Sequence, residues 1–246
     1  MSLKFVDVDF KYSRRKKVFE KFFFEFPRGT TLLLGRNGAG KSTLLSLASK
    51  VIMPANGFVS WNGINSDDGR RKKQYAGEVG WLPQDIRPIP GFTAREQVAY
   101  CGWLCGLNSR QSWSKAAVAL DEVNLDKLIN RKVSSLSGGE RRRVGLACCL
   151  VHEAKLLLLD EPSAGLDPEE RHNLRRILNN LRGRADVVIS SHEVDDISEV
   201  YDNICLINNG KITWSGDAEK YFSVIPNSRN LRHGAEDVFS KLVSKD

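Results

Sequence analysis

Apolar and polar positions divide the first part of this chain into short β-like runs. Residues 3–12 alternate between apolar and polar side chains, and residues 18–26 form a second apolar-rich run. Alternation with a period of two is typical of half-buried strands, so both runs are predicted to be strands, joined by a turn at residues 14–17. Residues 30–34 are a short apolar run that predicts another strand, and it leads into a glycine-rich segment.

The middle of the chain changes to helical spacing. A helix is predicted directly after the glycine-rich segment, over residues 41–50. From Thr93 to about residue 130 the apolar positions again follow a helical period, and Thr93 with Glu96 three residues later is the sequence signature of a capping box. A mostly helical insertion is therefore expected at about residues 90–150.

The last part of the chain alternates strands with helices. Residues 156–159 are entirely apolar, which is typical of a strand buried in a parallel sheet. Alternating strands and helices imply an α/β fold, here with a mostly parallel sheet and an antiparallel, β-rich edge. We expect a main domain at residues 1–216 and a helical tail at residues 217–246. The other predicted elements are strands at 57–61, 79–82 and 187–190, a hairpin formed by 204–207 and 211–214, and helices at 139–151, 168–181 and 194–200.

Size and composition fit a globular protein with a real core. The chain has 246 residues, of which 41% are hydrophobic. No stretch approaches the roughly 18 consecutive apolar residues of a membrane-spanning helix, and residues 1–12 lack the pattern of a signal peptide. We therefore expect a soluble, cytosolic protein in which any membrane role depends on a partner.

The cysteines and the charge change this interpretation little. The five cysteines contain no C-x-x-C pair, so we interpret them as small buried residues in a reducing compartment, with metal binding by Cys101 and Cys105 as the alternative. The net charge of +7 comes from basic clusters at 14–17, 70–73 and 141–143. No aromatic residues lie among these clusters, which favours solvated surfaces over a specific nucleic-acid partner.

The strongest chemical signal is the glycine-rich segment. It fits the phosphate-loop pattern G-x-x-x-x-G-K-[ST], in which backbone N–H groups and a helix N-terminus hold phosphate. Lys41 is expected to reach the β- and γ-phosphates, and the Ser42 hydroxyl to bind Mg²⁺. A strand before the loop and a helix after it make a plain glycine turn the weaker interpretation. The predicted nucleotide-binding residues of this run are Gly35, Arg36, Asn37, Gly38, Ala39, Gly40, Lys41, Ser42 and Thr43.

Two carboxylates end the apolar strand at residues 156–159. Asp160 and Glu161 match the form of the second nucleotide motif of phosphate-loop ATPases. A buried strand would deliver Asp160 rigidly to Mg²⁺, and Glu161 would polarise the water that attacks the γ-phosphate. The alternative is a core strand with a solvated acidic end.

Residues 136–140, Leu-Ser-Gly-Gly-Glu, resemble the signature motif of the ATP-binding cassette (ABC) family. In that family the motif closes over the γ-phosphate that a second subunit holds. The resemblance therefore implies a head-to-tail dimer, a homodimer or a heterodimer, with two ATP molecules between the subunits. It also implies the family's fold, a phosphate-loop ATPase core with a β-rich edge subdomain and a helical subdomain. The residues expected to act on the partner's ATP are Ser137, Gly138, Gly139 and Glu140.

Further residues resemble the remaining family motifs, in the family's order. Gln84 resembles the Q-loop glutamine, which contacts Mg²⁺ or water and senses the membrane partner. Asp167 resembles the D-loop residue of the dimer interface, and His192 the switch histidine at the γ-phosphate. Tyr12 resembles the aromatic residue that stacks on adenine, with Phe10 as its competitor. The resemblance implies Glu161, His192 and Gln84 as catalytic residues and Ser42, Gln84 and Asp160 as the Mg²⁺ site.

The resemblance implies an ATP-hydrolysing transporter subunit at the cytoplasmic face of the cell membrane, with integral membrane permease subunits as partners. Residues 91–96 and 236–239 are most similar to ATPases of multidrug, antibiotic and bacteriocin export. The alternatives are a soluble ABC ATPase of a cofactor-assembly complex and an importer subunit. An importer often carries a C-terminal regulatory domain, for which the residues after Gly216 leave little room. The lack of sustained heptads between residues 43 and 136 speaks against DNA-repair members with a coiled coil.

Overall fold

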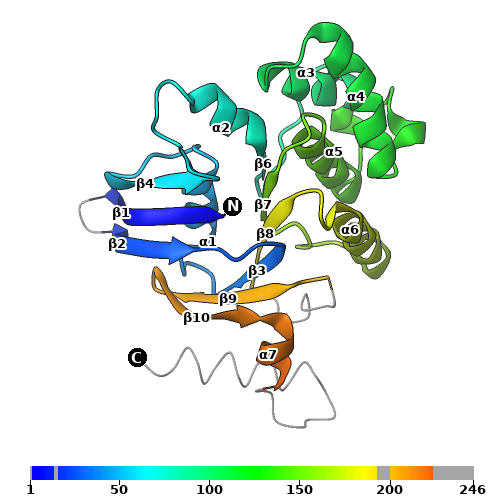
Figure 1. Ribbon diagram of the computed structural model, residues 1–246. Coiled ribbons are helices and arrows are strands. Elements are labelled where there is room, and N and C mark those ends of the chain that lie inside the picture. The colour runs from blue at the N-terminus through cyan, green and yellow to red at the C-terminus, as the bar shows by residue number, and fades with distance from the viewer. Residues whose placement is uncertain (1, 14–15, 193–199, 224–246) are drawn as a thin grey trace.

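The computed structural model describes residues 2–13, 16–192 and 200–223 of the chain. In these residues the strands form two sheets (Figure 1). The smaller sheet is antiparallel, with the strand order β2-β1-β4-β5. Its strands are β1 (Leu3–Ser13), β2 (Lys16–Glu25), β4 (Asn56–Trp61) and β5 (Ile64–Asn65).

The larger sheet forms the centre of the molecule. Its strand order is β10-β9-β3-β8-β7-β6, and every neighbouring pair is parallel except β10 with β9. The strands are β3 (Thr30–Leu34), β6 (Val79–Leu82), β7 (Leu156–Asp160), β8 (Asp186–Ser191), β9 (Asn203–Asn208) and β10 (Lys211–Asp217). Because β3 and β7 are buried along their whole length, their sequences are almost continuously apolar.

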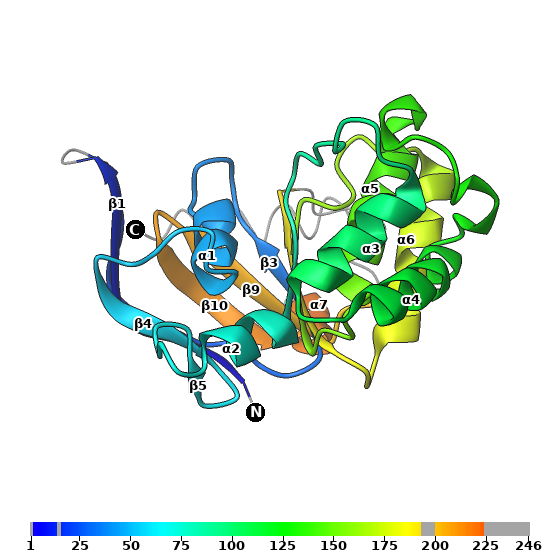
Figure 2. The same ribbon diagram turned by 90° about the horizontal axis from the view of Figure 1, so that it is seen from above.

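Helices cover the two faces of this sheet differently. Helix α1 (Lys41–Ala48) lies between the two sheets, where Leu44 and Leu45 join a core with β1, β4 and one face of the larger sheet (Figure 2). The other face is covered by α5 (Gly138–Leu150) and α6 (Pro168–Leu181). The remaining helices are α2 (Lys72–Glu78), α3 (Ala94–Leu104), α4 (Ser109–Glu122), α7 (Ala218–Ser223) and the 3-10 turns Asp126–Leu128 and Val133–Ser135.

Helices α3, α4 and α5 pack on one another and form a helical arm at one side of the molecule, drawn in green in Figures 1 and 2. The capping box predicted for Thr93 and Glu96 is present at the start of α3. The predicted α/β fold, with its mostly parallel sheet, antiparallel edge sheet and helical insertion, is confirmed.

Several element predictions need correction. Lys16 and Lys17 pair with Ser13 and Lys11 in a strand instead of forming a turn, because backbone pairing continues where the side chains are already exposed. The helical stretch after Thr93 is divided into two α-helices and a 3-10 turn, and a second capping box starts α4. Helix α2 and strand β5 were not expected. The predicted helix at 194–200 lies almost wholly outside the described residues, as does the tail beyond residue 223.

Candidate active site

The glycine-rich loop connects the end of β3 to the start of α1. Gly38 and Gly40 have φ angles of 84° and 109°, a region that side-chain-bearing residues rarely adopt. At Gly35 the constraint is space, since a Cβ atom there would lie 2.5 Å from the backbone oxygen of Ile207. Gly40 is the N-cap of α1 and offers no side chain to its N–H groups. The first turn of α1 therefore keeps its backbone donors for an anion.

A cleft of about 430 Å³ opens beside this loop. It collects predicted residues from five separate segments of the chain, which shows that the tertiary structure brings most of the expected site together. The lining residues are Tyr12, Lys16, Val18, Asn37, Gly38, Gly40, Lys41, Ser42, Thr43, Gln84, Glu161 and His192. Gly35, Arg36 and Ala39 belong to the same loop but do not line the cleft.

Lys41, Glu161 and His192 form a connected group of charged and titratable side chains. The Lys41 ammonium lies 3.4 Å from Glu161 Oε1 and donates to the backbone oxygen of Gly35 at 2.7 Å. His192 Nδ1 lies 2.7 Å from Glu161 Oε2. Burial lowers the pKa of Lys41, and the negative charge of Glu161 opposes that shift. A lysine held in this way gains from any further negative charge that enters the cleft.

Asp160 lies directly behind the loop. Ser42 Oγ donates to Asp160 Oδ1 at 3.0 Å, and Ser190 Oγ donates to the same oxygen at 2.6 Å. The Ser190 hydroxyl also accepts from the backbone N–H of Glu161 at 2.9 Å. One serine of the neighbouring strand thus holds both the carboxylate predicted for a metal and the backbone of the residue predicted to act on water.

The aromatic wall of the cleft is Tyr12. Its side chain is 58% exposed, and its hydroxyl lies 3.1 Å from Thr43 Oγ1. Phe10, the competing aromatic residue, packs edge-on against the Tyr12 ring at a centroid distance of 4.9 Å and does not line the cleft. Tyr12 therefore presents a free aromatic surface beside the phosphate loop, supported from behind by Phe10.

The signature residues lie away from this cleft, at the N-terminus of α5. Ser137 is the N-cap, and it forms a capping box in which its side chain accepts from the N–H of Glu140 at 3.1 Å. Ser137 and Gly138 are exposed. A Cβ atom on Gly139 would lie 1.7 Å from Glu170 Oε1, so α6 approaches this turn closely. Asp167, the predicted D-loop residue, is the exposed N-cap of α6 and accepts from the N–H of Glu170 at 2.8 Å.

Four contributors to the site were not predicted. Lys16 and Val18 line the cleft, although Lys16 lay in the basic run predicted to be a turn and Val18 began the strand predicted at 18–26. Ser190 was noted as part of the run before His192 but not given its role between the two carboxylates. Arg142 was seen as part of a basic cluster, yet its guanidinium donates to the backbone oxygen of Gln84 and to the segment after Glu161.

Of the three residues predicted to bind Mg²⁺, two are in direct contact and the third lines the same cleft. The Ser42 hydroxyl and the Asp160 carboxylate are hydrogen-bonded neighbours, and Gln84 lines the same cleft. Hard divalent cations of this kind are held by one or two carboxylates plus substrate phosphates, so these donors fit. Within the described ranges, no group of three or more His, Cys, Asp or Glu side chains could hold a metal ion, which includes the region of Cys101 and Cys105.

Comparison with known proteins shows which family the chain resembles. A sequence model of the family described as ABC transporter matches residues 20–164. The uncharacterized ABC transporter ATP-binding protein YxlF of Bacillus subtilis is 33% identical over 76% of this chain and 61% of its own length. The linearmycin resistance ATP-binding protein LnrL of the same species is 30% identical, over 80% of this chain and 64% of its own length. The molybdenum import ATP-binding protein ModC of Brucella melitensis is 32% identical, over 80% of this chain and 55% of its own length.

Solved structures share the fold at low sequence identity. An ATP-binding subunit of an ABC transporter has a TM-score of 0.81 and 22% identity, covering 98% of this chain and 99% of that one. A dimeric ATP-binding cassette, MJ0796, bound to ADP and Pi has a TM-score of 0.77 and 22% identity, covering 88% and 98%. The chain spans less than two thirds of the length of the three relatives named above.

Proposed function

The chain belongs to the ABC transporter family, and from that premise we propose that it is the ATPase subunit that powers export through separate membrane subunits. The observation that supports this most directly is the contact of Glu161 with both Lys41 and His192 beside the phosphate loop. We assign residues 1–216 to the ATPase domain, with the helical arm at about 90–150, and residues 217–246 to a C-terminal tail.

ATP binds along the cleft. The phosphate loop and the N-terminus of α1 hold the phosphates, and the exposed ring of Tyr12 stacks on adenine. Lys41 reaches the β- and γ-phosphates, and its lowered pKa reflects a buried position in which added negative charge stabilises the ammonium. Lys16 adds a second positive charge on the lining of the cleft.

Glu161 acts on the attacking water. Its carboxylate lies on the cleft side, oriented by His192 at one oxygen and by Lys41 at the other. A carboxylate held in this way accepts a proton from water as the bond to the γ-phosphate forms. His192 fixes the direction of the carboxylate and lies within reach of the γ-phosphate itself. Gln84 contributes an amide to the lining of the same cleft.

Mg²⁺ would be held by Ser42, Asp160 and Gln84 together with the phosphates. When bound, it neutralises charge that develops on the β- and γ-phosphate oxygens. Ser190 keeps the Asp160 carboxylate directed toward Ser42 through its own hydrogen bond.

The second half of the machinery comes from another subunit. The signature turn of α5 is exposed and lies outside the cleft lining, as a turn that serves a partner's nucleotide must. Ser137, Gly138, Gly139 and Glu140 then close over the γ-phosphate of the partner. Asp167 lies at the same interface. The structural neighbour MJ0796, which shares this fold, is itself a dimer bound to ADP and Pi.

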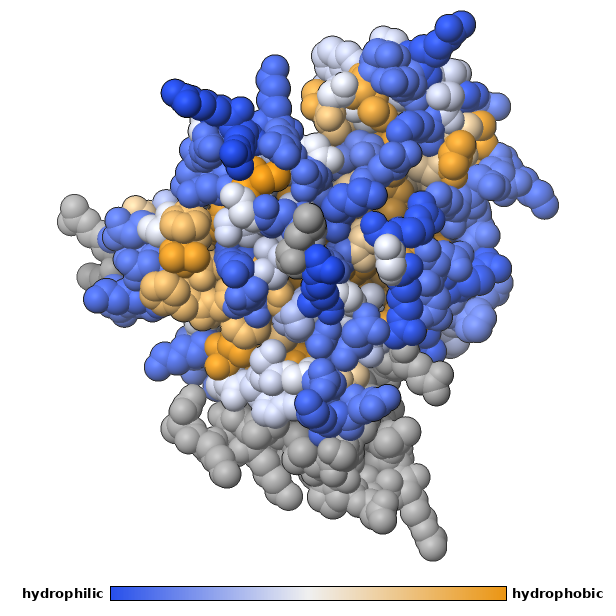
Figure 3. All heavy atoms as spheres, viewed as in Figure 1, coloured by the Kyte–Doolittle hydropathy of each residue, from blue (hydrophilic) through white to orange (hydrophobic). Residues whose placement is uncertain are grey.

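A membrane partner docks beside Gln84, on the helical arm. Phe92, Tyr100 and Trp103 form a chain of ring contacts there, with centroid distances of 5.9 Å and 6.0 Å, and Trp103 is 54% exposed. Figure 3 shows apolar side chains on the helical arm and a second apolar area over the antiparallel sheet. No helix of the described residues could itself cross a membrane. An apolar, aromatic surface of this kind is suited to a protein partner, and a membrane permease in that role would hold this subunit at the cytoplasmic face.

Export is supported by the likeness to LnrL, a resistance protein, and by the sequence of residues 91–96. Import is the second candidate, because ModC is similar at 32% identity. The membrane subunit selects the cargo, so the direction of transport is tested through that partner.

The test uses the Glu161→Gln variant. It should bind ATP like the wild type, lose at least about 100-fold in hydrolysis and accumulate as an ATP-dependent dimer in gel filtration. Glu153→Gln, which changes an exposed glutamate paired with Lys115, is the control and should hydrolyse normally. Hydrolysis by Glu161→Gln at the wild-type rate would exclude Glu161 as the base.

Tagged Glu161→Gln protein with ATP should also capture a multi-span membrane protein from detergent-solubilised native membranes. Recovery of soluble partners alone would argue for a cofactor-assembly ATPase instead. Cloning and vesicle transport assays of the captured permease would then separate export from import.

A further inference from the structure

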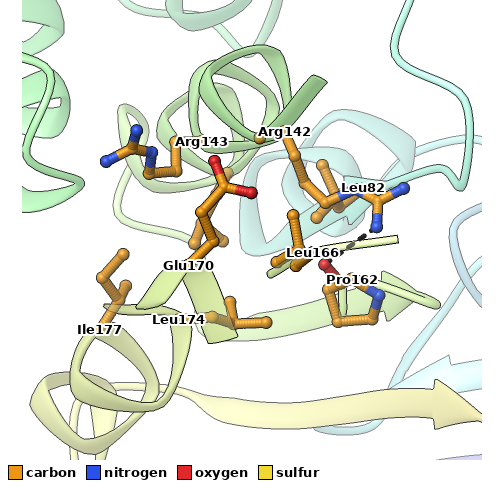
Figure 4. Close-up of a pocket in the computed structure, with 10 residues that line it drawn as sticks. Leu82, Arg142, Arg143, Pro162, Leu166, Glu170, Leu174 and Ile177 are labelled. Carbon is orange, nitrogen blue, oxygen red and sulfur yellow. Dashed lines mark hydrogen bonds between the residues drawn. The ribbon is translucent and has the colours of Figure 1, made fainter. Parts of the chain in front are cut away.

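Arg142 joins three segments that surround the candidate active site. Its side chain extends from α5 in the helical arm to the segment that follows β7, and Figure 4 draws its hydrogen bond to Pro162. It also reaches the segment after β6, at Gln84. The four hydrogen bonds run from Nη1 to the backbone oxygens of Glu161 (3.0 Å), Pro162 (3.0 Å) and Ala164 (2.7 Å), and from Nη2 to that of Gln84 (3.2 Å).

The chemistry of this contact requires an arginine. A guanidinium carries five N–H donors in a planar fork, so it can address carbonyl groups on two different segments at once, whereas a lysine presents one point charge. Hydrogen bonds from a charged donor are about twice as strong as neutral ones. Burial lowers the pKa of Arg142, while the charges of Glu161 and Glu170 counteract that shift. The charge is therefore partly removed from water and directed at carbonyl dipoles.

The backbone that Arg142 holds is itself under constraint. Glu161 has a φ angle of 48°, a left-handed conformation that non-glycine residues seldom adopt. Such a residue keeps this conformation only when its surroundings fix it. Ser190 fixes the N–H of Glu161, and Arg142 fixes its carbonyl oxygen. The direction in which the Glu161 carboxylate points therefore depends on both.

We infer that Arg142 is a positioning residue for ATP hydrolysis: it fixes the backbones of Glu161 and Gln84 in one arrangement and couples both to the helical arm. The inference rests on the proposed role of Glu161 as the base. The signature turn begins the same helix and lies directly before Arg142, so a rotation of the arm moves Arg142 and the signature together. When the signature turn closes on the partner's nucleotide, the same movement therefore acts on the position of Glu161, the base of this subunit.

The experiment compares Arg142→Gln and Arg142→Lys with a matched control. The control variant is Arg184→Gln. The guanidinium of Arg184 also links the core to the helical arm, because it lies 3.1 Å from the Glu122 carboxylate of α4. Arg184 lies just before β8, however, at the end of the sheet away from the cleft. Steady-state hydrolysis is measured, with kcat normalised to the number of sites that bind a fluorescent ATP analogue. Thermal unfolding of each variant confirms that the assay is run on folded protein.

We expect Arg142→Gln to lower kcat by roughly 10- to 100-fold, because a misplaced catalytic group is costly, with KM for ATP within about twofold of wild type. Arg142→Lys should recover part of that loss, and Arg184→Gln should have the wild-type kcat. A wild-type kcat for Arg142→Gln, or a raised KM with unchanged kcat, would overturn the inference. So would full activity of Arg142→Lys, because the fork would then be unnecessary.

Two further results keep the test decisive. If Arg142→Gln does not fold, Arg142→Lys decides alone: a lowered kcat at unchanged KM supports the inference, and wild-type kinetics contradicts it. Glu161→Gln is measured in parallel. Full hydrolysis by Glu161→Gln would refute the proposed function, whereas a defect in Glu161→Gln with none in the Arg142 variants would refute this inference alone.

Discussion

The protein has two glycine-containing helix N-termini that are expected to hold phosphate, and they are built in opposite ways. The N-terminus of α1 is buried, and its N-cap Gly40 provides no side-chain acceptor. The N-terminus of α5 is exposed, and the capping box satisfies the backbone N–H groups of Ser137 and Glu140. A helix start without a cap depends on a ligand for its N–H groups, whereas a capped start is stable by itself.

This difference fits the proposed division of labour. The α1 terminus belongs to the site that binds ATP within one subunit, with Lys41 fixed nearby by the oxygen of Gly35. In this proposal the α5 terminus binds a nucleotide carried by another subunit. Its capping box keeps the helix start folded when that nucleotide is absent. The two helix starts also need glycine for different reasons. Gly40 has a φ angle that other residues rarely adopt, whereas Gly139 lies close to the Glu170 side chain.

The largest expected effect is that a substitution at the α1 terminus changes ATP affinity, whereas one at the α5 terminus changes only the rate of hydrolysis. Lys41→Ala should weaken ATP binding to the isolated subunit by about 100-fold or more, because a buried charge-assisted contact to phosphate is lost. Ser137→Arg should leave that affinity unchanged and abolish hydrolysis. Titration with a fluorescent ATP analogue and a phosphate-release assay measure both. Equal loss of ATP affinity in the two variants would remove the distinction between the termini.

Mixing the two inactive variants should restore part of the activity. Each dimer of one Lys41→Ala and one Ser137→Arg subunit keeps one intact composite site, so an equal mixture of a freely exchanging homodimer should reach about a quarter of the wild-type rate. The separate variants are the controls. A mixture as inactive as its components would contradict a site shared between subunits.

The glycines should differ in how a substitution is rescued. Gly139→Ala introduces a clash with the end of the Glu170 side chain, which is flexible and can move aside, so the loss of unfolding free energy should be small. Glu170→Ala should relieve it in the double variant. Gly40→Ala imposes a strained φ angle instead, so Phe19→Leu, which enlarges the space near its Cβ, should not restore stability. Denaturant unfolding of the four variants distinguishes strain from crowding.

The smallest effect concerns the capping box of α5. Glu140→Ala removes the acceptor for the backbone N–H of Ser137 and should lower the unfolding free energy by about 0.5–1 kcal/mol. ATP affinity of the isolated subunit should not change, because this terminus lies outside the cleft. Reduced ATP affinity in Glu140→Ala would show that the two termini are not independent.

Local sequence signals predicted most of the fold. The apolar run at 156–159, the capping box at Thr93 and the hairpin around Asn208 and Gly210 are all present, because period, caps and turn residues act over a few neighbouring positions. Helix α2 was missed because most of its residues are polar and only Tyr75 is buried.

The sequence by itself determined which residues can bind phosphate and which strands can deliver carboxylates, because those patterns are contiguous. Only the tertiary structure decided that Lys16 and Val18 line the cleft, that Ser190 lies between Asp160 and Glu161, and that Arg142 of α5 contacts the segments after both β6 and β7. The hydrogen bonds of Arg142, for example, reach residues between 19 and 58 positions away in the sequence. The physical reason is that side-chain hydrogen bonds to backbone carbonyls carry no residue pattern at the accepting end, so packing alone reveals them.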